Sequence, residues 1–308
     1  MALEEKKKAQ RNPGPTWGFA FLNVMDDVLP DEFVRVVLHL GAAVAVKLMP
    51  DRRKQSEDYL RFALGREPTF RDVVRHFSAF SELLIVRLRV SRGLALKVVI
   101  AEQSDPDAVA FLRTTGQGLF GSFHFGHSDL LGFLLTDSGR KVAMVRTRVG
   151  NSEDTEELAK TFSAKVQFVW VNDPSMALFA IKESVEAGLS IAMQCDRVEF
   201  SSRLEPFEFL GATRQFPFTI YHLSLLFQVP VVFCMGVPLP DKATAVFAAP
   251  IFRPTGRKSV DLPAARAHFQ TVISQLESLI RQNPYLWFNF LPLNPVAAVS
   301  TAADRGSR

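Results

Sequence analysis

Short apolar segments recur along the sequence after Asp107 and constrain the fold more than any other feature. The segments are GLFGSFHF, KVAMVRT, VQFVWV, SIAMQCD and VPVVFCMG, and each is separated from the next by enough residues for a crossover. Buried strands that alternate with helices in this way are typical of parallel strand pairs. The pattern therefore predicts an α/β fold with a largely parallel sheet.

The first third of the chain shows helical patterns instead. Pro30-Asp31-Glu32 begins one helix, a turn is expected at Pro50-Asp51, and Ser56 to Leu64 forms a further amphipathic segment. From Thr69 to Arg89 the apolar residues recur at intervals of three and four, the helical period. We therefore expect four regions: a disordered basic tail over 1–14, a helical region over 15–100, an α/β core over 101–295 and a frayed tail over 296–308.

The composition is that of a folded protein. Of the 308 residues 47% are hydrophobic and 22% are charged, which excludes a disordered or collagen-like chain. Cys195 and Cys234 are too few for a disulfide framework or a four-cysteine zinc site, and they fit a reducing cytoplasm. The formal net charge of +4 permits either an acidic partner or an anionic membrane. No metal site is expected, because metal-ligand spacing is missing around His39, His76, His222 and His268.

The N-terminal region raises the question of membrane contact. The first dozen residues are charged and lack an apolar core, so we expect no secretory signal peptide. Residues 33–49 are mostly apolar but include Arg35, His39 and Lys47, which makes the stretch too short and too charged for a spanning helix. Together with the basic cluster at 51–54, it fits an interfacial or half-inserted helix pair and equally a buried core helix.

The segment HFGHSDLLG carries the clearest chemical signal. It places His124 at the end of a strand and Asp129 five positions later, at the start of a helix, so the turn is expected to bring the two side chains together. A carboxylate bonded to one imidazole nitrogen leaves the other nitrogen free to act as a base. The alternative is structural, with Ser128 or Asp129 capping the helix.

A neighbouring glycine pattern points to no cofactor. Gly116, Gly118 and Gly121 match a dinucleotide fingerprint letter for letter, but that motif needs a strand before it and a helix after it. Here a helical segment precedes the glycines and a strand follows them. We therefore expect a turn entering a strand, with no nicotinamide or flavin.

Around His124 the chain resembles the lipid A biosynthesis acyltransferase family of the glycerolipid acyltransferase superfamily, whose signature is His, four residues, then Asp or Glu. Similar blocks are SFHFGHSDLLG, VAMVRTRVGNSEDTEEL, SIAMQCDRVEF with its following Phe-Leu-Gly turn, and NPYLWFNFLPL. The start TWGFAFL is similar to a branch found in aryl polyene gene clusters, so the resemblance covers about residues 15 to 295. The chain departs from the family at His127, where Asn is frequent, and at Lys160, where an Arg is expected.

The resemblance implies a glycerol-3-phosphate-acyltransferase-like fold and an acyl transfer. A fatty acyl group would move from acyl carrier protein or coenzyme A to a hydroxyl or amine of a lipid acceptor, with His124 as general base and Asp129 as its orienting partner. No metal or redox cofactor is implied. The expected partners are acyl carrier protein, a lipid and the cytoplasmic face of the bacterial inner membrane, with no nucleic acid.

Four further residues are candidates for binding substrate or the oxyanion. Arg146 and Arg148 end one apolar run, and guanidinium groups bind anions bidentately. Asp196 and Arg197 end another run, and ligands in open α/β sheets gather at the carboxyl ends of strands. Alternatively, Arg146 and Arg148 are ordinary solvated surface residues, and Asp196 and Arg197 form a structural ion pair.

Two other functions and one other mechanism stay open at this stage. A non-catalytic lipid- or acyl-carrier-binding protein and an acyl thioesterase would both use the same fold. A third route makes Cys195 a nucleophile that carries the acyl group, although the adjacent Asp196 would raise the pKa of its thiol. Basic residues that would dock an acidic carrier protein or lipid phosphates, unless they are ordinary solvated positions, are Arg87, Arg89, Arg92 and Lys97.

Overall fold

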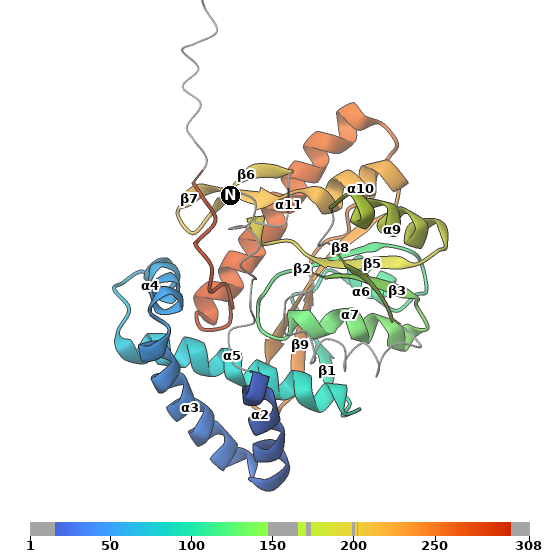
Figure 1. The fold of residues 1–308 in the computed structure, drawn as a ribbon. Helices are drawn as coiled ribbons and strands as arrows, with labels where there is room; N and C mark the ends of the chain where they lie inside the picture. Colours follow the sequence, from blue (N-terminus) through green and yellow to red (C-terminus); the bar gives the residue numbers. More distant parts are fainter. Residues whose placement is uncertain (1–15, 147–165, 171–173, 199–200, 202, 297–308) are drawn as a thin grey trace, which may run out of the picture.

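A seven-stranded sheet flanked by helices forms the centre of the protein in a computed structural model, which describes residues 16–146, 166–170, 174–198, 201 and 203–296 (Figure 1). The strand order is β1-β9-β8-β2-β5-β3-β4, and every neighbouring pair is parallel except β8 with β9. A separate two-stranded antiparallel ribbon is formed by β6 (Leu204–Phe209) and β7 (Ala212–Pro217). The protein is therefore an α/β protein with a mixed, mostly parallel sheet.

The five apolar runs identified in the sequence all form strands of this sheet, as predicted. They are β2 (Leu119–Ser122), β3 (Val142–Arg146), β4 (Val166–Trp170), β5 (Ser190–Gln194) and β8 (Val231–Pro238). Two further strands complete the sheet beyond β8, namely β9 (Thr244–Ala248) and the edge strand β1 (Val98–Ile100). β1 lies inside the region 15–100 that was expected to be helical. It belongs to the sheet because it pairs with β9, a strand far away in the sequence.

Helices cover both faces of the sheet (Figure 1). The helical elements described after β1 are α6 (Pro106–Leu112), the 3-10 turn η1 (Ser128–Leu130), α7 (Leu131–Leu134), the 3-10 turn η2 (Leu135–Ser138), α9 (Pro174–Glu186), α10 (Thr219–Phe227) and α11 (Lys258–Gln282). On the α11 face the rings of Phe123 and Phe233 stack 5.3 Å apart, and Phe269 of α11 packs against both. Many of the phenylalanines therefore serve core packing.

One glycine of the dinucleotide-like pattern has a packing role. Gly121 lies inside β2, and a Cβ atom at this position would lie 2.4 Å from the ring of Phe233. The pattern follows α6 and enters β2, as predicted. The close ring contact explains the glycine without any cofactor.

The N-terminal region consists of α2 (Thr16–Val28), α3 (Asp31–Leu48), α4 (Pro50–Leu64) and α5 (Phe70–Ser91). The chain bends by 104° between α3 and α4, at the position where a turn was expected. Thr69 and Asp72 form a capping box that begins α5. Asp72 also accepts hydrogen bonds from Arg66 and from the hydroxyl of Tyr285, so this helix start is tied to the C-terminal part of the chain.

Among the described residues, no single helix has the length and apolar character needed to cross a bilayer. The bent pair of α3 and α4 meets that standard only when the two helices are counted together. The tails predicted over 1–14 and 296–308 lie outside the described residues, except for Val296, which forms an isolated bridge with Arg214.

Candidate active site

The predicted strand, turn and helix around His124 are present. β2 ends at Ser122, and the chain then turns sharply through Gly126, whose φ is +50°. A Cβ atom at Gly126 would lie 2.1 Å from the carbonyl oxygen of Gly236, so only glycine allows this close approach. The amide of Gly126 donates to Leu286 O at 2.7 Å, which fixes the turn against the C-terminal segment.

His124 is held by Asp196 rather than by Asp129. Its Nδ1 lies 2.7 Å from Asp196 Oδ1, and its backbone amide donates to Asp196 Oδ2 at 2.8 Å. The indole Nε1 of Trp287 donates to the same Oδ2 at 2.8 Å, and the Asp196 residue is only 1% exposed. The carboxylate is therefore buried, fully hydrogen-bonded and fixed in direction, as an imidazole-orienting group requires.

The register of the sheet explains this pairing. Strands β2 and β5 are parallel neighbours with Ser122 opposite Gln194, so the positions two residues further along are His124 and Asp196. The amide of Cys195 donates to Ser122 O at 2.8 Å and extends the ladder by one step. Both side chains thus leave the sheet at its carboxyl edge, where α/β proteins gather their ligands.

Asp129 is placed differently from the prediction. Its carboxylate accepts a hydrogen bond from Arg146 Nη2 at 3.0 Å and lies 3.4 Å from Nε of Arg87. No hydrogen bond joins Asp129 to His124 in the described part of the chain. The cause is local, because the helix predicted after His124 starts as the 3-10 turn η1, which directs Asp129 toward the end of β3 and toward α5.

Two arginine candidates reach the same edge of the sheet. Arg146 is the last residue of β3, and its guanidinium lies over the rings of Phe133 and Phe168 at 5.7 and 5.9 Å. Arg197 follows Asp196 and is close enough to His124 to influence its titration. Arg148 lies outside the described residues.

Two site residues were not identified from the sequence. Arg87 comes from α5, and it was considered only as a docking cation on a helix surface. Trp287 belongs to the NPYLWFNFLPL block, where only the resemblance drew attention to it. Arg87 reaches the site through its contact with Asp129, and Trp287 through its hydrogen bond to Asp196. No local sequence pattern predicts such long-range contacts.

The charges of the site favour a neutral imidazole between ionised carboxylates. Burial lowers the pKa of His124, Arg197 lowers it further, and Asp196 opposes both effects. Burial would raise the pKa of Asp129, but Arg146 and Arg87 outweigh it and lower that pKa to about 2. Burial likewise opposes ionisation of Asp196, and His124 with its hydrogen bond holds the pKa of Asp196 below the ordinary value. Nδ1 therefore carries the proton, and Nε2 offers a lone pair.

Cys195 is a poor nucleophile in this environment. The residue is 2% exposed, and burial followed by the charge of Asp196 raises the pKa of its thiol well above the ordinary value. A thiolate is the reactive form, and here it is strongly disfavoured. The geometry gives no support to a covalent acyl-cysteine.

An apolar cavity of about 200 Å³ lies against the site, between the sheet and helices α6 and α7. Its wall includes Ser122, two residues before His124, and Ser128, directly before Asp129. Apart from these serines and Arg113 the lining is apolar, with Phe120 and Leu131 among its members. A mostly apolar cavity of this kind can accept a hydrocarbon chain.

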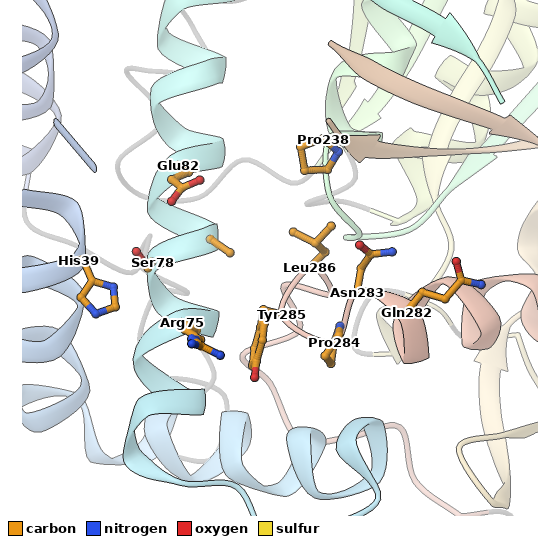
Figure 2. A pocket seen from close by; sticks show the side chains of 11 residues that line it. His39, Arg75, Ser78, Glu82, Pro238, Gln282, Asn283, Pro284, Tyr285 and Leu286 are labelled. Carbon is orange, nitrogen blue, oxygen red and sulfur yellow. The ribbon is translucent and has the colours of Figure 1, made fainter. Parts of the chain in front are cut away.

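A larger and more polar cleft of about 550 Å³ lies between the N-terminal helices and the end of α11, and Figure 2 shows His39, Arg75, Glu82 and Tyr285 around it. None of the predicted catalytic residues lines this cleft. Its contact with the site is indirect, through Leu286, which accepts the hydrogen bond of Gly126.

The cations considered as a docking surface are engaged within the protein. Arg89 pairs with Asp26 at 2.6 Å and also with Asp31. Arg92 pairs with Asp27 at 2.6 Å. Lys97 lies 2.9 Å from Asp241. Together with the contact of Arg87 to Asp129, these ion pairs reduce the positive surface that an acidic carrier protein would meet.

No protein-family model matches the chain, and no curated protein matches it. Among the described residues no group of three His, Cys, Asp or Glu side chains is placed to hold a metal ion. Functional conclusions therefore depend on the geometry around His124.

Proposed function

We propose that this protein is an acyltransferase that moves a fatty acyl group from a thioester to a hydroxyl or amine of a lipid or lipid-like acceptor. The observation that carries the proposal is the buried Asp196 carboxylate bonded to Nδ1 of His124, beside an apolar cavity. The resemblance of the sequence to the lipid A acyltransferase family adds support. The donor is an acyl carrier protein or coenzyme A thioester, and the reaction takes place on the cytoplasmic face of the bacterial inner membrane.

His124 is the general base of the proposed reaction. Its Nε2 removes the proton of the acceptor hydroxyl as the oxygen attacks the thioester carbonyl, and Asp196 stabilises the imidazolium that results. The tetrahedral oxyanion collapses, the carbon–sulfur bond breaks, and the departing thiolate takes the proton from the imidazolium. The products are the acylated acceptor and a free thiol, and His124 is again neutral.

The arginines stabilise negative charge in this scheme. Arg146 and Arg197 lie at the carboxyl edge of the sheet, close to Asp129 and His124 respectively, where they can bind an anionic part of a substrate or the oxyanion. Asp129 holds Arg146 and Arg87 in place, which is a positioning role and differs from the one expected for it. Such fixed partners keep a guanidinium pre-oriented for its anion.

The apolar cavity accommodates the part of the acyl chain next to the thioester. Ser122 and Ser128 line it close to the catalytic turn, and apart from Arg113 the other lining residues, such as Phe120, Leu131 and Leu135, are apolar. A chain bound there leaves water, and burial of each methylene favours binding by about 0.8 kcal/mol. This preference supports a fatty acyl donor over a short polar one.

The decisive experiment measures thiol release from a panel of acyl carrier protein and coenzyme A thioesters, with and without membrane lipid extract. We expect release that depends on lipid, collapses in His124→Ala and Asp196→Asn, and persists in the control Cys195→Ala. Release that needs His124 but ignores every acceptor would indicate a thioesterase. Retained thioester binding without any release would indicate a binding protein.

A further inference from the structure

Gln194, the last residue of β5, carries a side-chain amide that has no hydrogen-bond partner within the described part of the chain. Its Nε2 atom is nevertheless buried. Rotation of the amide by 180° would exchange its nitrogen and oxygen without supplying a partner, so a free N–H donor is present in both orientations. Buried amide donors are nearly always paired in folded proteins, because an unpaired donor destabilises the fold. An unpaired donor at the carboxyl edge of the sheet therefore requires an explanation.

The strand geometry places this amide on the face of the sheet that carries the apolar cavity. Side chains two residues apart on a strand point to the same side. Ala192, two residues before Gln194, lines the cavity. Asp196, two residues after it, bonds to His124, and the amide of Cys195 continues the ladder between them. Gln194 therefore lies between the cavity and the His124–Asp196 pair.

Ser122 is the neighbour of Gln194 on β2. The two residues are register partners, and Ser122 also lines the cavity. Among the described residues its hydroxyl has no hydrogen-bond partner. On the other side, the register of β5 with β3 places Arg146 next to Gln194, but the guanidinium of Arg146 already donates to Asp129. The hydroxyl of Ser122 and the amide of Gln194 thus form a pair of free donors side by side.

We propose that the amide of Gln194, together with the hydroxyl of Ser122, binds the carbonyl oxygen of the acyl thioester and stabilises the oxyanion that forms on it. This inference rests on the proposed acyl transfer and identifies the donors to its oxyanion. As the acceptor oxygen attacks, the electron pair of the carbonyl π bond moves onto the carbonyl oxygen, which receives two hydrogen bonds and no proton. The pair re-forms the carbonyl as the carbon–sulfur bond breaks and the thiolate leaves.

The spacing of the site fits this assignment. The row of Gln194 and Ser122 lies about 6.6 Å along the strands from the row of Asp196 and His124. An acceptor oxygen bonded to the imidazole and a carbonyl bonded to the amide can therefore stand next to each other, at the separation of about 3–3.5 Å that attack requires. The acyl chain continues in the opposite direction, past Ala192 and into the cavity.

Gln194→Met tests the inference, because methionine has a similar length and no N–H donor. The substrates are dodecanoyl thioesters of coenzyme A and of acyl carrier protein, with membrane lipid extract as acceptor. We expect kcat to fall by about 10²–10³-fold, the loss caused by removal of one oxyanion donor, with little change in KM. The midpoint of urea unfolding should not fall, because the native amide contributes no hydrogen bond to the fold.

The matched control is Gln117→Met, just before β2 and at the opposite end of that strand from His124. Nε2 of Gln117 donates to Val185 O at 2.7 Å and to Leu189 O at 3.0 Å. The same substitution should here lower the midpoint of urea unfolding and leave kcat unchanged. The two variants therefore separate a loss of catalysis from a loss of stability.

A binding measurement separates this inference from the proposed function. It uses the His124→Ala chain, which cannot complete the transfer. The ligands are the dodecanoyl thioester and the dodecyl thioether, in which a CH₂ group replaces the carbonyl, each attached to coenzyme A and to acyl carrier protein. We expect the thioester to bind about three- to tenfold more tightly than the thioether. Gln194→Met in the same background should remove this difference.

The outcomes are distinct. A Gln194→Met chain with native kcat would overturn the inference and leave the acyltransferase intact. Equal binding of thioester and thioether by His124→Ala would overturn it as well, and failure of both ligands to bind would overturn the inference and the proposed function together. If the native chain releases no thiol but still distinguishes the two ligands through Gln194, the carbonyl site stands and the proposed chemistry fails.

Discussion

His124 and Asp196 are 72 residues apart in sequence, yet Nδ1 of one lies 2.7 Å from Oδ1 of the other. Parallel pairing of β2 with β5 brings them together, and the backbone amide of His124 fixes the second carboxylate oxygen. The pairing comes from the sheet and not from the local turn. The imidazole is consequently oriented by a pair of neighbouring strands inside the sheet.

Replacement of Asp196 should therefore affect activity more than stability of the fold. In Asp196→Asn the amide no longer stabilises the imidazolium and permits the wrong tautomer. We expect kcat to fall by roughly 10⁴-fold, the loss caused by the same change in a Ser-His-Asp triad. Steady-state thiol release measures this, with circular dichroism as a folding control. A fall of less than about tenfold would show that Asp196 does not orient the base.

The lowered pKa of His124 predicts how the activity depends on pH. A general base must be deprotonated, and burial together with Arg197 lowers the pKa of His124. Activity should therefore persist below the ordinary histidine pKa of about 6.5 and decline only as the pH falls through the lowered value.

A variant of the neighbouring arginine tests the cause of that shift. Arg197→Gln removes a positive charge, so the acid limb of the kcat/KM profile should move to higher pH. The readout is the direction in which the midpoint of the acid limb moves. A change in KM without such a movement would indicate only a lost contact with the substrate. An unchanged or lower midpoint would contradict the electrostatic explanation.

Trp287 is predicted to position Asp196. In Trp287→Phe the carboxylate loses its indole donor, and a lost hydrogen bond to a charged group costs about 1.5–3 kcal/mol in the free energy of unfolding. The pKa of Asp196 should rise as well. A double-mutant cycle in urea unfolding checks the coupling, because the cost of Trp287→Phe should shrink in the Asp196→Asn background. Strict additivity of the two changes would show that the bond contributes nothing.

The strands that form the core of the sheet could be predicted from the sequence because each is a compact apolar run. The edge strand β1 could not, since Val98–Ile100 is exposed, three residues long and paired with a strand far away in the sequence. The spacing of apolar residues in a sequence indicates which positions of an element are buried. An edge strand without burial leaves no such pattern.

The candidate site was predictable in its location and less so in its contacts. Carboxyl ends of strands meet at one edge of a parallel sheet, so Arg146, Asp196 and Arg197 could be placed near His124 from the sequence. Which carboxylate touches the imidazole depends on strand register and on one 3-10 turn, neither of which has a sequence signature. Arg87 depends on how a whole helix packs across the core.

Asp72 at the start of α5 makes the stability of the fold depend on pH. The same helix carries Arg87 to the site. Arg66 and the Thr69 bonds lower the pKa of Asp72 even though burial opposes them. Since the folded pKa lies below the unfolded value of about 3.9, the carboxylate stabilises the fold above that pH, and the contribution is lost as the pH falls toward the folded value.

Asp72→Asn should accordingly lower the free energy of unfolding by about 2 kcal/mol at pH 7, because the hydrogen bonds that the Asp72 carboxylate accepts from Thr69 and Arg66 lose their ionic character. The partner Arg66 side chain is 52% exposed, so the ion pair supplies only a small part of this. Urea unfolding at pH 7 and near pH 3 measures the difference, which should shrink at the lower pH. A cost that stays constant across this range would place the effect in packing rather than in the charge of Asp72.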